Sequence, residues 1–208
     1  MIYHVLNRGN RQAEVFHKPA DYDAFLEAID QGKQRLPVDL FGYCLMPNHF
    51  HLVIRPKEDG DLGSWMRWLL TTHALRYHRH HQTSGHVWQG RYKAFPIQDD
   101  AHLATVLRYV ERNPLRAELV SKAEYWKWSS LPSRLEGNPL LWLKKPAPQG
   151  PDWLKRVNEP LSAGDLKRIQ DSINRERPFG DEAWTRKMVT QLGLESTLRG
   201  PGRPKKVQ

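Results

Sequence analysis

Residues 42–54 carry the sequence GYCLMPNHFHLVI. Two runs rich in β-forming residues, 38–46 and 49–55, are separated there by Pro47-Asn48, and this pattern predicts a β-hairpin. Side chains two apart on a strand share a face, so His49 and His51 should point to one side of a sheet while Phe50 points to the other. The two imidazoles therefore offer two corners of a metal site. The alternative is that both are surface histidines on a half-exposed strand.

The segments on either side of the hairpin alternate between strand and helix patterns. Residues 2–7 and 87–97 predict two further strands. Apolar spacing and caps predict three helices: one after Asp21 with Phe25, Leu26 and Ile29, one from Ser64 to Arg76, and one from Asp99-Asp100 to Asn113, where Pro114 should end it. The order β-α-β-β-α-β-α predicts an α+β fold with a ferredoxin-like, split βαβ core, in which an antiparallel sheet carries helices on one face.

The C-terminal third has a different pattern. Proline-rich residues 132–152 predict a linker, and residues 153–198 predict a small helical segment with two amphipathic helices. The first should begin around Ser162 and the second should end at Gly193, and packing on the core is favoured over reading a duplex. Residues 199–208 predict a disordered basic tail, in which Gly202-Arg203-Pro204 resembles the core of an AT-hook.

The composition indicates a soluble globular protein of the cytoplasm with an anionic partner. The 208 residues include 32 Lys and Arg against 23 Asp and Glu, a formal net charge of +9 at pH 7. No apolar run approaches the ~20 residues that span a bilayer, so no membrane partner is expected. The single cysteine, Cys44, excludes an intramolecular disulfide and a cysteine-based zinc site, in agreement with a reducing compartment.

Two residues of the third predicted helix suggest phosphodiester chemistry. Tyr109 and Asn113 are four residues apart, so they stack on one helix face. A tyrosine hydroxyl can attack a phosphodiester, and a nearby amide oxygen can join the ligands of a metal. Because an unperturbed tyrosine has a pKa of about 10, attack at neutral pH needs a base or a metal that polarises the phosphate. Alternatively, Tyr109 lies at the edge of the core and Asn113 only ends a helix.

Four motifs in a fixed order support a more specific interpretation of the chain than any one of them does alone. They are the opening stretch at 42–54, GHVWQGRYKAF at 85–95, LRYVERNPLRAELV at 107–120 and YWKWSS at 125–130. With YHVLNRGNRQ at 3–12, they resemble the REP-associated tyrosine transposases, single-tyrosine members of the HUH nuclease superfamily. The resemblance covers residues 1–131.

This resemblance implies a catalytic domain over residues 1–131 that acts on hairpin-forming, REP-like palindromic DNA. It implies a metal-dependent single-stranded DNA endonuclease and strand transferase, with Tyr109 as the nucleophile that forms a 5′-phosphotyrosine bond. Mg²⁺ or Mn²⁺ would be held by His49 and His51, with Asn113 as a third ligand. The enzyme would be associated with the nucleoid in the cytoplasm, and we expect a monomer, with a dimer as the alternative.

A basic segment predicts where DNA would lie. Residues 62–98 contain no Asp or Glu but five of the ten histidines, and Trp88 or Tyr92 there could stack on an unpaired base. The alternative is a solvated basic helix face. The predicted DNA contacts are Arg8, Arg11, Arg67, Arg76, Arg79, Arg91, Lys93, Arg116 and Arg203.

Two other functions compete with the strand transferase. A protein that kept the fold and the basic segment but lost catalysis would regulate palindromic repeats by binding alone. An unrelated hydrolase would use a metal on His49 and His51 and would not need Tyr109. The intact set of four residues favours the transferase, because neither alternative explains why Tyr109 and Asn113 stand in matching contexts.

Overall fold

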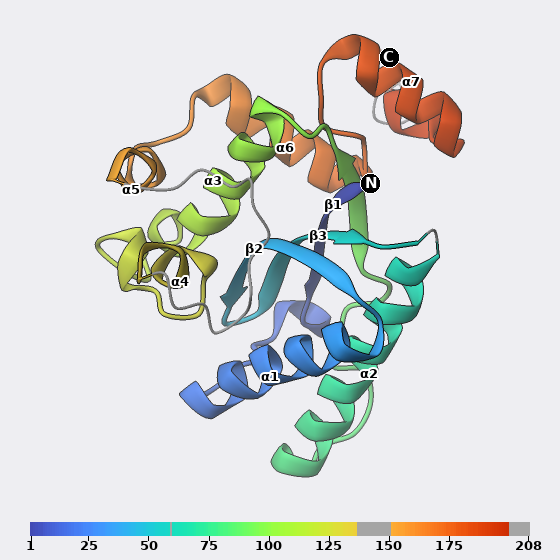
Figure 1. Cartoon of the computed structure of the whole chain (residues 1–208). Helices are drawn as coiled ribbons and strands as arrows, with labels where there is room; N and C mark the ends of the chain where they lie inside the picture. Colours follow the sequence, from blue (N-terminus) through green and yellow to red (C-terminus); the bar gives the residue numbers. More distant parts are fainter. Residues whose placement is uncertain (59, 137–150, 200–208) are drawn as a thin grey trace, which may run out of the picture.

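A computed structural model describes residues 1–58, 60–136 and 151–199 (Figure 1). Its strands are β1 (Ile2–Arg8), β2 (Val38–Met46), β3 (His49–Pro56) and β4 (Lys93–Ile97). Its helices are α1 (Pro19–Arg35), α2 (Asp61–His81), α3 (Ala101–Arg116), α4 (Ser130–Glu136), α5 (Pro151–Asn158), α6 (Ala163–Arg175) and α7 (Glu182–Leu192). Short 3-10 turns lie at Asn10–Gln12, Ala123–Tyr125 and Glu195–Leu198.

The four strands form one sheet in the order β2-β3-β1-β4. Every neighbouring pair is antiparallel. Strand β3 therefore lies between β1 and β2 and splits the β1–α1–β2 unit. The predicted α+β class with an antiparallel sheet is confirmed.

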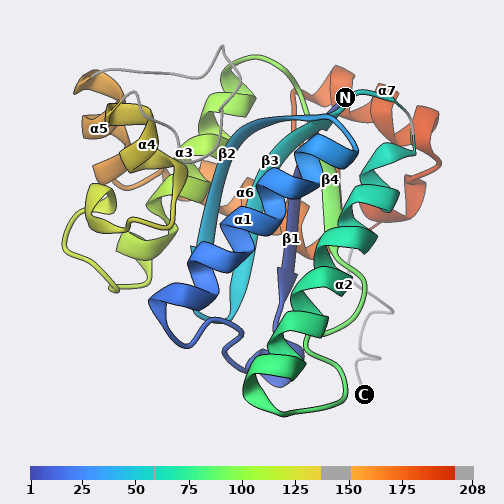
Figure 2. The same cartoon turned by 60° about the horizontal axis from the view of Figure 1, so that its bottom comes forward.

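Helices cover both faces of the sheet, so the expectation of helices on one face is wrong. Helices α1 and α2 lie on one face and α3 lies on the other (Figure 2). The side chains of Phe50 and Leu52 pack toward α1 and α2, whereas Val53 packs toward α3. All nine residues of β2 are buried. Its almost continuous apolar run is the pattern of a strand that is covered on both sides, and this signal was available in the sequence.

Three element boundaries differ from the predictions. Helix α2 begins at Asp61, three residues before the predicted cap Ser64, because Gly60 adopts the left-handed region (φ +94°) that turns the chain into the helix. Strand β4 begins only at Lys93, because Gly90 (φ +143°) interrupts the extended run that precedes it. Helix α3 continues through Pro114 to Arg116, since a proline near the end of a helix removes only one backbone bond.

Helices α5 and α6 pack on α3, and α6 also contacts the edge strand β4. Trp153 and Val157 of α5 and Ile169 of α6 are buried in the same apolar cluster as α3. On the outer side of α3, Arg108 donates to the carbonyls of Glu159 and Pro160, both at 2.9 Å. Arg108 and Arg112 of α3 thus satisfy carbonyls at and just after the C-terminal end of α5, which the helix itself leaves unpaired. Most of the predicted 132–152 linker and residues 200–208 of the predicted tail lie outside the described residues.

The caps of α6 and α7 follow the sequence signals. The Ser162 side chain accepts a hydrogen bond from the backbone of Asp165 at the start of α6. Gly193 ends α7 in the left-handed region at φ +65°. Both predicted caps are confirmed, because cap chemistry is local and depends on few distant residues.

Candidate active site

A cavity of about 480 Å³ opens on the α3 face of the sheet. It is lined by His49 and His51 of β3 and by Tyr109 of α3. The basic residues on its wall are Arg8, Arg91, Lys93 and Arg116. Tertiary structure thus brings the predicted nucleophile, both predicted metal ligands and four predicted DNA contacts together in one place.

Strand geometry sets the two imidazoles on one face. The ring centroids of His49 and His51 are 5.0 Å apart, and Phe50 between them points into the opposite core. This orientation confirms the prediction from the two-residue period of a strand. The surface alternative does not hold for His51, which is only 3% exposed.

Each imidazole is anchored through its Nδ1 atom. His49 Nδ1 lies 2.6 Å from Oδ1 of Asn48, and His51 Nδ1 lies 2.9 Å from Nε2 of His4. No described residue forms a hydrogen bond with Nε2 of either ring, and both residues line the cavity. Burial, followed by the nearby Arg8 and Arg116, lowers the pKa of His49 to about 4. Burial also lowers the pKa of His51 well below its usual range.

These features fit a metal ion. Metal ligation requires neutral imidazoles, and ligating histidines usually hold their second nitrogen on another polar group. Both conditions are met at His49 and His51. An ion bound there would take Nε2 of each ring as two of its ligands.

Tyr109 lies beside the histidine pair. Its ring centroid is 5.8 Å from that of His51, and the guanidinium of Arg116 lies 5.8 Å from the Tyr109 ring centroid. Burial raises the pKa of Tyr109, whereas the positive charge of Arg116 and the side chain of Asn113 lower it. The effects of Arg116 and Asn113 on this pKa matter because a tyrosinate is a far better nucleophile than a neutral tyrosine.

Asn113 is completely buried below Tyr109. Its Oδ1 accepts a hydrogen bond of 2.8 Å from Arg116, and its Nδ2 has no hydrogen-bond partner among the described residues. Oδ1 of Asn113 can therefore ligate a metal only if it gives up the hydrogen bond from Arg116. In this arrangement Asn113 orients Arg116 over Tyr109.

The other predicted DNA contacts are not in the cavity. Arg67, Arg76 and Arg79 belong to α2, on the opposite face of the sheet. Arg11 lies in the 3-10 turn after β1 and does not line the cavity. Arg203 lies outside the described residues. The basic segment of residues 62–98 is thus divided between two faces of the molecule.

Sequence reasoning missed several residues of the site. His4 could have been found from the two-residue period, which places it on the same face of β1 as the cavity residue Arg8. Ile173 and Asn174 of α6 also line the cavity, and Ile173 accepts a hydrogen bond of 3.3 Å from Nζ of Lys93. No local pattern indicates that α6 reaches the site, because its position depends on tertiary packing.

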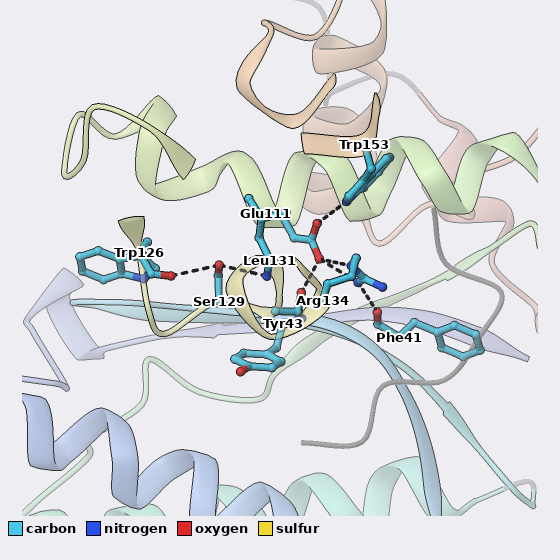
Figure 3. A network of polar contacts seen from close by, with 9 residues as sticks. Phe41, Tyr43, Glu111, Trp126, Ser129, Leu131, Arg134 and Trp153 are labelled. Atoms are coloured by element: carbon cyan, nitrogen blue, oxygen red, sulfur yellow. Dashed lines mark hydrogen bonds and ion pairs between the residues drawn. The ribbon is translucent and has the colours of Figure 1, made fainter. Parts of the chain in front are cut away.

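A buried ionic network holds α3 in place (Figure 3). Glu111 lies two residues from Tyr109 and is fully buried. Its Oε1 accepts hydrogen bonds from Ser130 Oγ (2.6 Å) and from the guanidinium of Arg134 (2.7 and 3.0 Å), and its Oε2 accepts one from Trp153 Nε1 (2.8 Å). The network joins α3 to α4 and α5, and Arg134 extends it to β2 by donating to the carbonyl of Phe41 at 2.7 Å.

Comparison with known proteins places the chain in a family. The family model described as "Transposase IS200 like" matches residues 1–113, and the chain belongs to that family. Within it, the chain is similar to the "Putative REP-associated tyrosine transposase" of Haemophilus influenzae. The two are 28% identical over an alignment of 145 residues, which covers 60% of this chain and 82% of the relative. The sequence resemblance to the REP-associated tyrosine transposases is thereby confirmed.

A solved structure supports the fold. It shows a REP-associated tyrosine transposase bound to a REP hairpin, and it matches 78% of this chain and 92% of its own with a TM-score of 0.55 at 18% identity. Within the described part of this chain, no helix combines the length and the apolar character that crossing a membrane requires.

Proposed function

We propose that this protein nicks and joins single-stranded DNA at hairpin-forming, REP-like palindromes through a covalent 5′-phosphotyrosine intermediate at Tyr109. The observation that carries the proposal is the shared cavity of Tyr109, His49 and His51. Family membership and the hairpin-bound relative support DNA as the substrate.

The chemistry is a transesterification. Tyr109 Oη would attack the scissile phosphorus, the bond from phosphorus to the 3′ oxygen would break, and the leaving oxygen would take up a proton as Tyr109 gives one up. The phosphotyrosine conserves the bond energy, so the reverse reaction by a 3′ hydroxyl reseals or transfers the strand without a nucleotide cofactor. When bound, Mg²⁺ or Mn²⁺ would polarise the phosphate and offset the developing charge.

The side chains around Tyr109 have separate proposed roles. His49 and His51 would hold the ion, with Asn113 as a third ligand if its bond to Arg116 is exchanged. Arg8, Arg91, Lys93 and Arg116 would bind the phosphates that flank the cleaved bond. Charge-assisted hydrogen bonds from these side chains to phosphate are strong and do not depend on the base sequence of the DNA.

The composition of the cavity favours a monomer. Tyr109 and both histidines come from one chain and already lie together, so no second copy is needed to complete the site. We also propose that Arg203, in the basic tail, contacts DNA outside the cavity.

The decisive experiment follows covalent adducts on denaturing gels. Wild type and Tyr109→Phe are incubated with single-stranded REP hairpins carrying a 5′ flank, in Mg²⁺ or Mn²⁺. Wild type should form a denaturation-resistant adduct, and Tyr109→Phe should lose the adduct while retaining hairpin binding. Tyr125→Phe, at a tyrosine that is 61% exposed, is the matched control and should form the adduct normally.

Other outcomes would identify the competing functions. If wild type binds hairpins but forms no adduct with any of them, the protein is a binding regulator. If cleavage depends on metal and on His49 and His51 but survives in Tyr109→Phe, it is a hydrolase. Either result would refute the proposal.

A further inference from the structure

A second group of metal-ligating side chains lies on the α1 and α2 face of the sheet. Asp21 stands at the start of α1, and His80 and His81 stand at the end of α2. Each offers one ligand atom, and these atoms lie within 4.8 Å of one another. Among the described residues, no other group of three or more His, Cys, Asp or Glu side chains meets this condition.

Helix capping fixes the carboxylate of this group. Oδ2 of Asp21 accepts hydrogen bonds from the backbone N–H groups of His17 (2.9 Å) and Lys18 (3.2 Å), while Oδ1 has no hydrogen-bond partner in the described chain. The two backbone groups thus hold the carboxylate in place, with Oδ2 on the side of His81. Such preorganisation reduces the entropic cost of ligand binding.

The two imidazoles have few competing partners. His81 Nε2 lies 3.8 Å from Oδ2 of Asp21, and the centroids of His80 and His81 are 5.0 Å apart. Neither ring forms a hydrogen bond with a described residue. By contrast, His78 in the same turn uses both nitrogens, one on Thr83 and one on the carbonyl of Gly85.

A small cavity and a buried orphan nitrogen give independent support. Asp21, His80 and His81 line a cavity of about 10 Å³. A volume of this size holds a single water or ion. His73 lines the same cavity and is only 5% exposed, yet its Nδ1 has no hydrogen-bond partner among the described residues. Because buried polar atoms usually have a partner, this nitrogen is a polar group beside the ligand cluster that a bound water could satisfy.

The surrounding charges select the class of ion. Arg76 lines the cavity and the charge of Lys18 also acts on His81, so charge alone would hold a cation only weakly at this site. Only one carboxylate is present. Two imidazoles and one carboxylate suit Zn²⁺ and similar transition metals, which form coordinate bonds with nitrogen, better than Mg²⁺.

We propose that Asp21, His80 and His81 bind one transition-metal ion of the Zn²⁺ class, which joins the end of α2 to the start of α1. The site is separate from His49 and His51, which lie across the sheet. The chain continues from α2 into residues 82–92, where the Trp88 ring centroid lies 5.0 Å from that of His73 and Arg91 lines the catalytic cavity. An ion at this position would therefore order the segment that leads into the active site.

The experiment isolates this site by removing the other one. Zn²⁺ is titrated into metal-free full-length His49→Ala/His51→Ala protein by calorimetry, and bound zinc is counted after gel filtration. One equivalent should remain bound, and adding His80→Ala/His81→Ala should abolish it. Mg²⁺ should not compete. Co²⁺ in place of Zn²⁺ should give visible absorption bands that the added substitutions remove.

Two controls exclude unfolding and unspecific histidine binding. His102→Ala removes a histidine that pairs with Asp100 at 2.7 Å outside any such group, and it should leave the zinc equivalent intact. Asp21→Asn keeps an acceptor for the α1 cap and should still weaken zinc binding at least tenfold. The proposal is overturned if His49→Ala/His51→Ala binds no zinc, or if folded protein lacking His80 and His81 binds it as before.

Discussion

The buried Glu111 network gives a sharp stability prediction. Glu111→Gln keeps the size of the side chain but removes its charge and turns one acceptor into a donor. Two things follow: Arg134, whose side chain is 2% exposed, becomes an uncompensated buried cation, and one of the three donor side chains faces another donor. Breaking one partner of a buried ion pair costs about 3–5 kcal/mol. We expect Glu111→Gln to lower the free energy of unfolding by that amount.

A double-mutant cycle tests whether the charge is the cause. Arg134→Met removes the cation, so in Glu111→Gln/Arg134→Met no unpaired charge remains. The double variant should be more stable than the sum of the single effects by about 0.5–3 kcal/mol. Urea unfolding at pH 7, followed by circular dichroism, measures all four proteins. Arg186→Met breaks the exposed pair with Glu182 and should leave the unfolding midpoint unchanged.

Two results would refute this reasoning. One is a cost of Glu111→Gln below about 1 kcal/mol, which is the scale of an ordinary exposed contact. The other is strict additivity in the cycle, which would mean that Glu111 and Arg134 act independently. Because Glu111 lies two residues from Tyr109, the same variants should also lose adduct formation as they approach their melting temperature.

Two further predictions concern the helix that carries Tyr109. Arg116→Ala removes a positive charge that lowers the pKa of Tyr109, so this pKa should rise and the pH profile of adduct formation should shift to higher pH. Arg116→Lys should keep the wild-type profile. An unchanged profile in Arg116→Ala would contradict this prediction. Gly42→Ala would place a Cβ 2.6 Å from Cδ2 of Leu107 in α3, so the free energy of unfolding in urea should fall by about 1–3 kcal/mol. An unchanged free energy of unfolding would contradict this prediction and show that α3 can shift.

Local chemistry explains which parts of the fold could be predicted. The hairpin, its turn and the orientation of His49 and His51 follow from a two-residue period that holds for any strand. The caps at Ser162 and Gly193 follow from backbone groups that each helix end must satisfy. The predicted bounds of α2, β4 and α3 were wrong because the effect of a glycine or a proline depends on its position in the element. Gly60 lets α2 begin earlier, Gly90 delays the start of β4, and Pro114 is accommodated in the last turn of α3.

Local sequence patterns are enough to establish the order of the strands along the chain, the shared face of His49 and His51, and the presence of Tyr109 and Asn113 on one helix. Tertiary packing places α3 and α2 on opposite faces of the sheet, and this divides the basic residues between the two faces. It also decided that α6 walls the cavity and that Arg134 pairs with Glu111. Periodicity and capping act over a few residues, whereas these placements depend on how apolar surfaces distant in the sequence pack together.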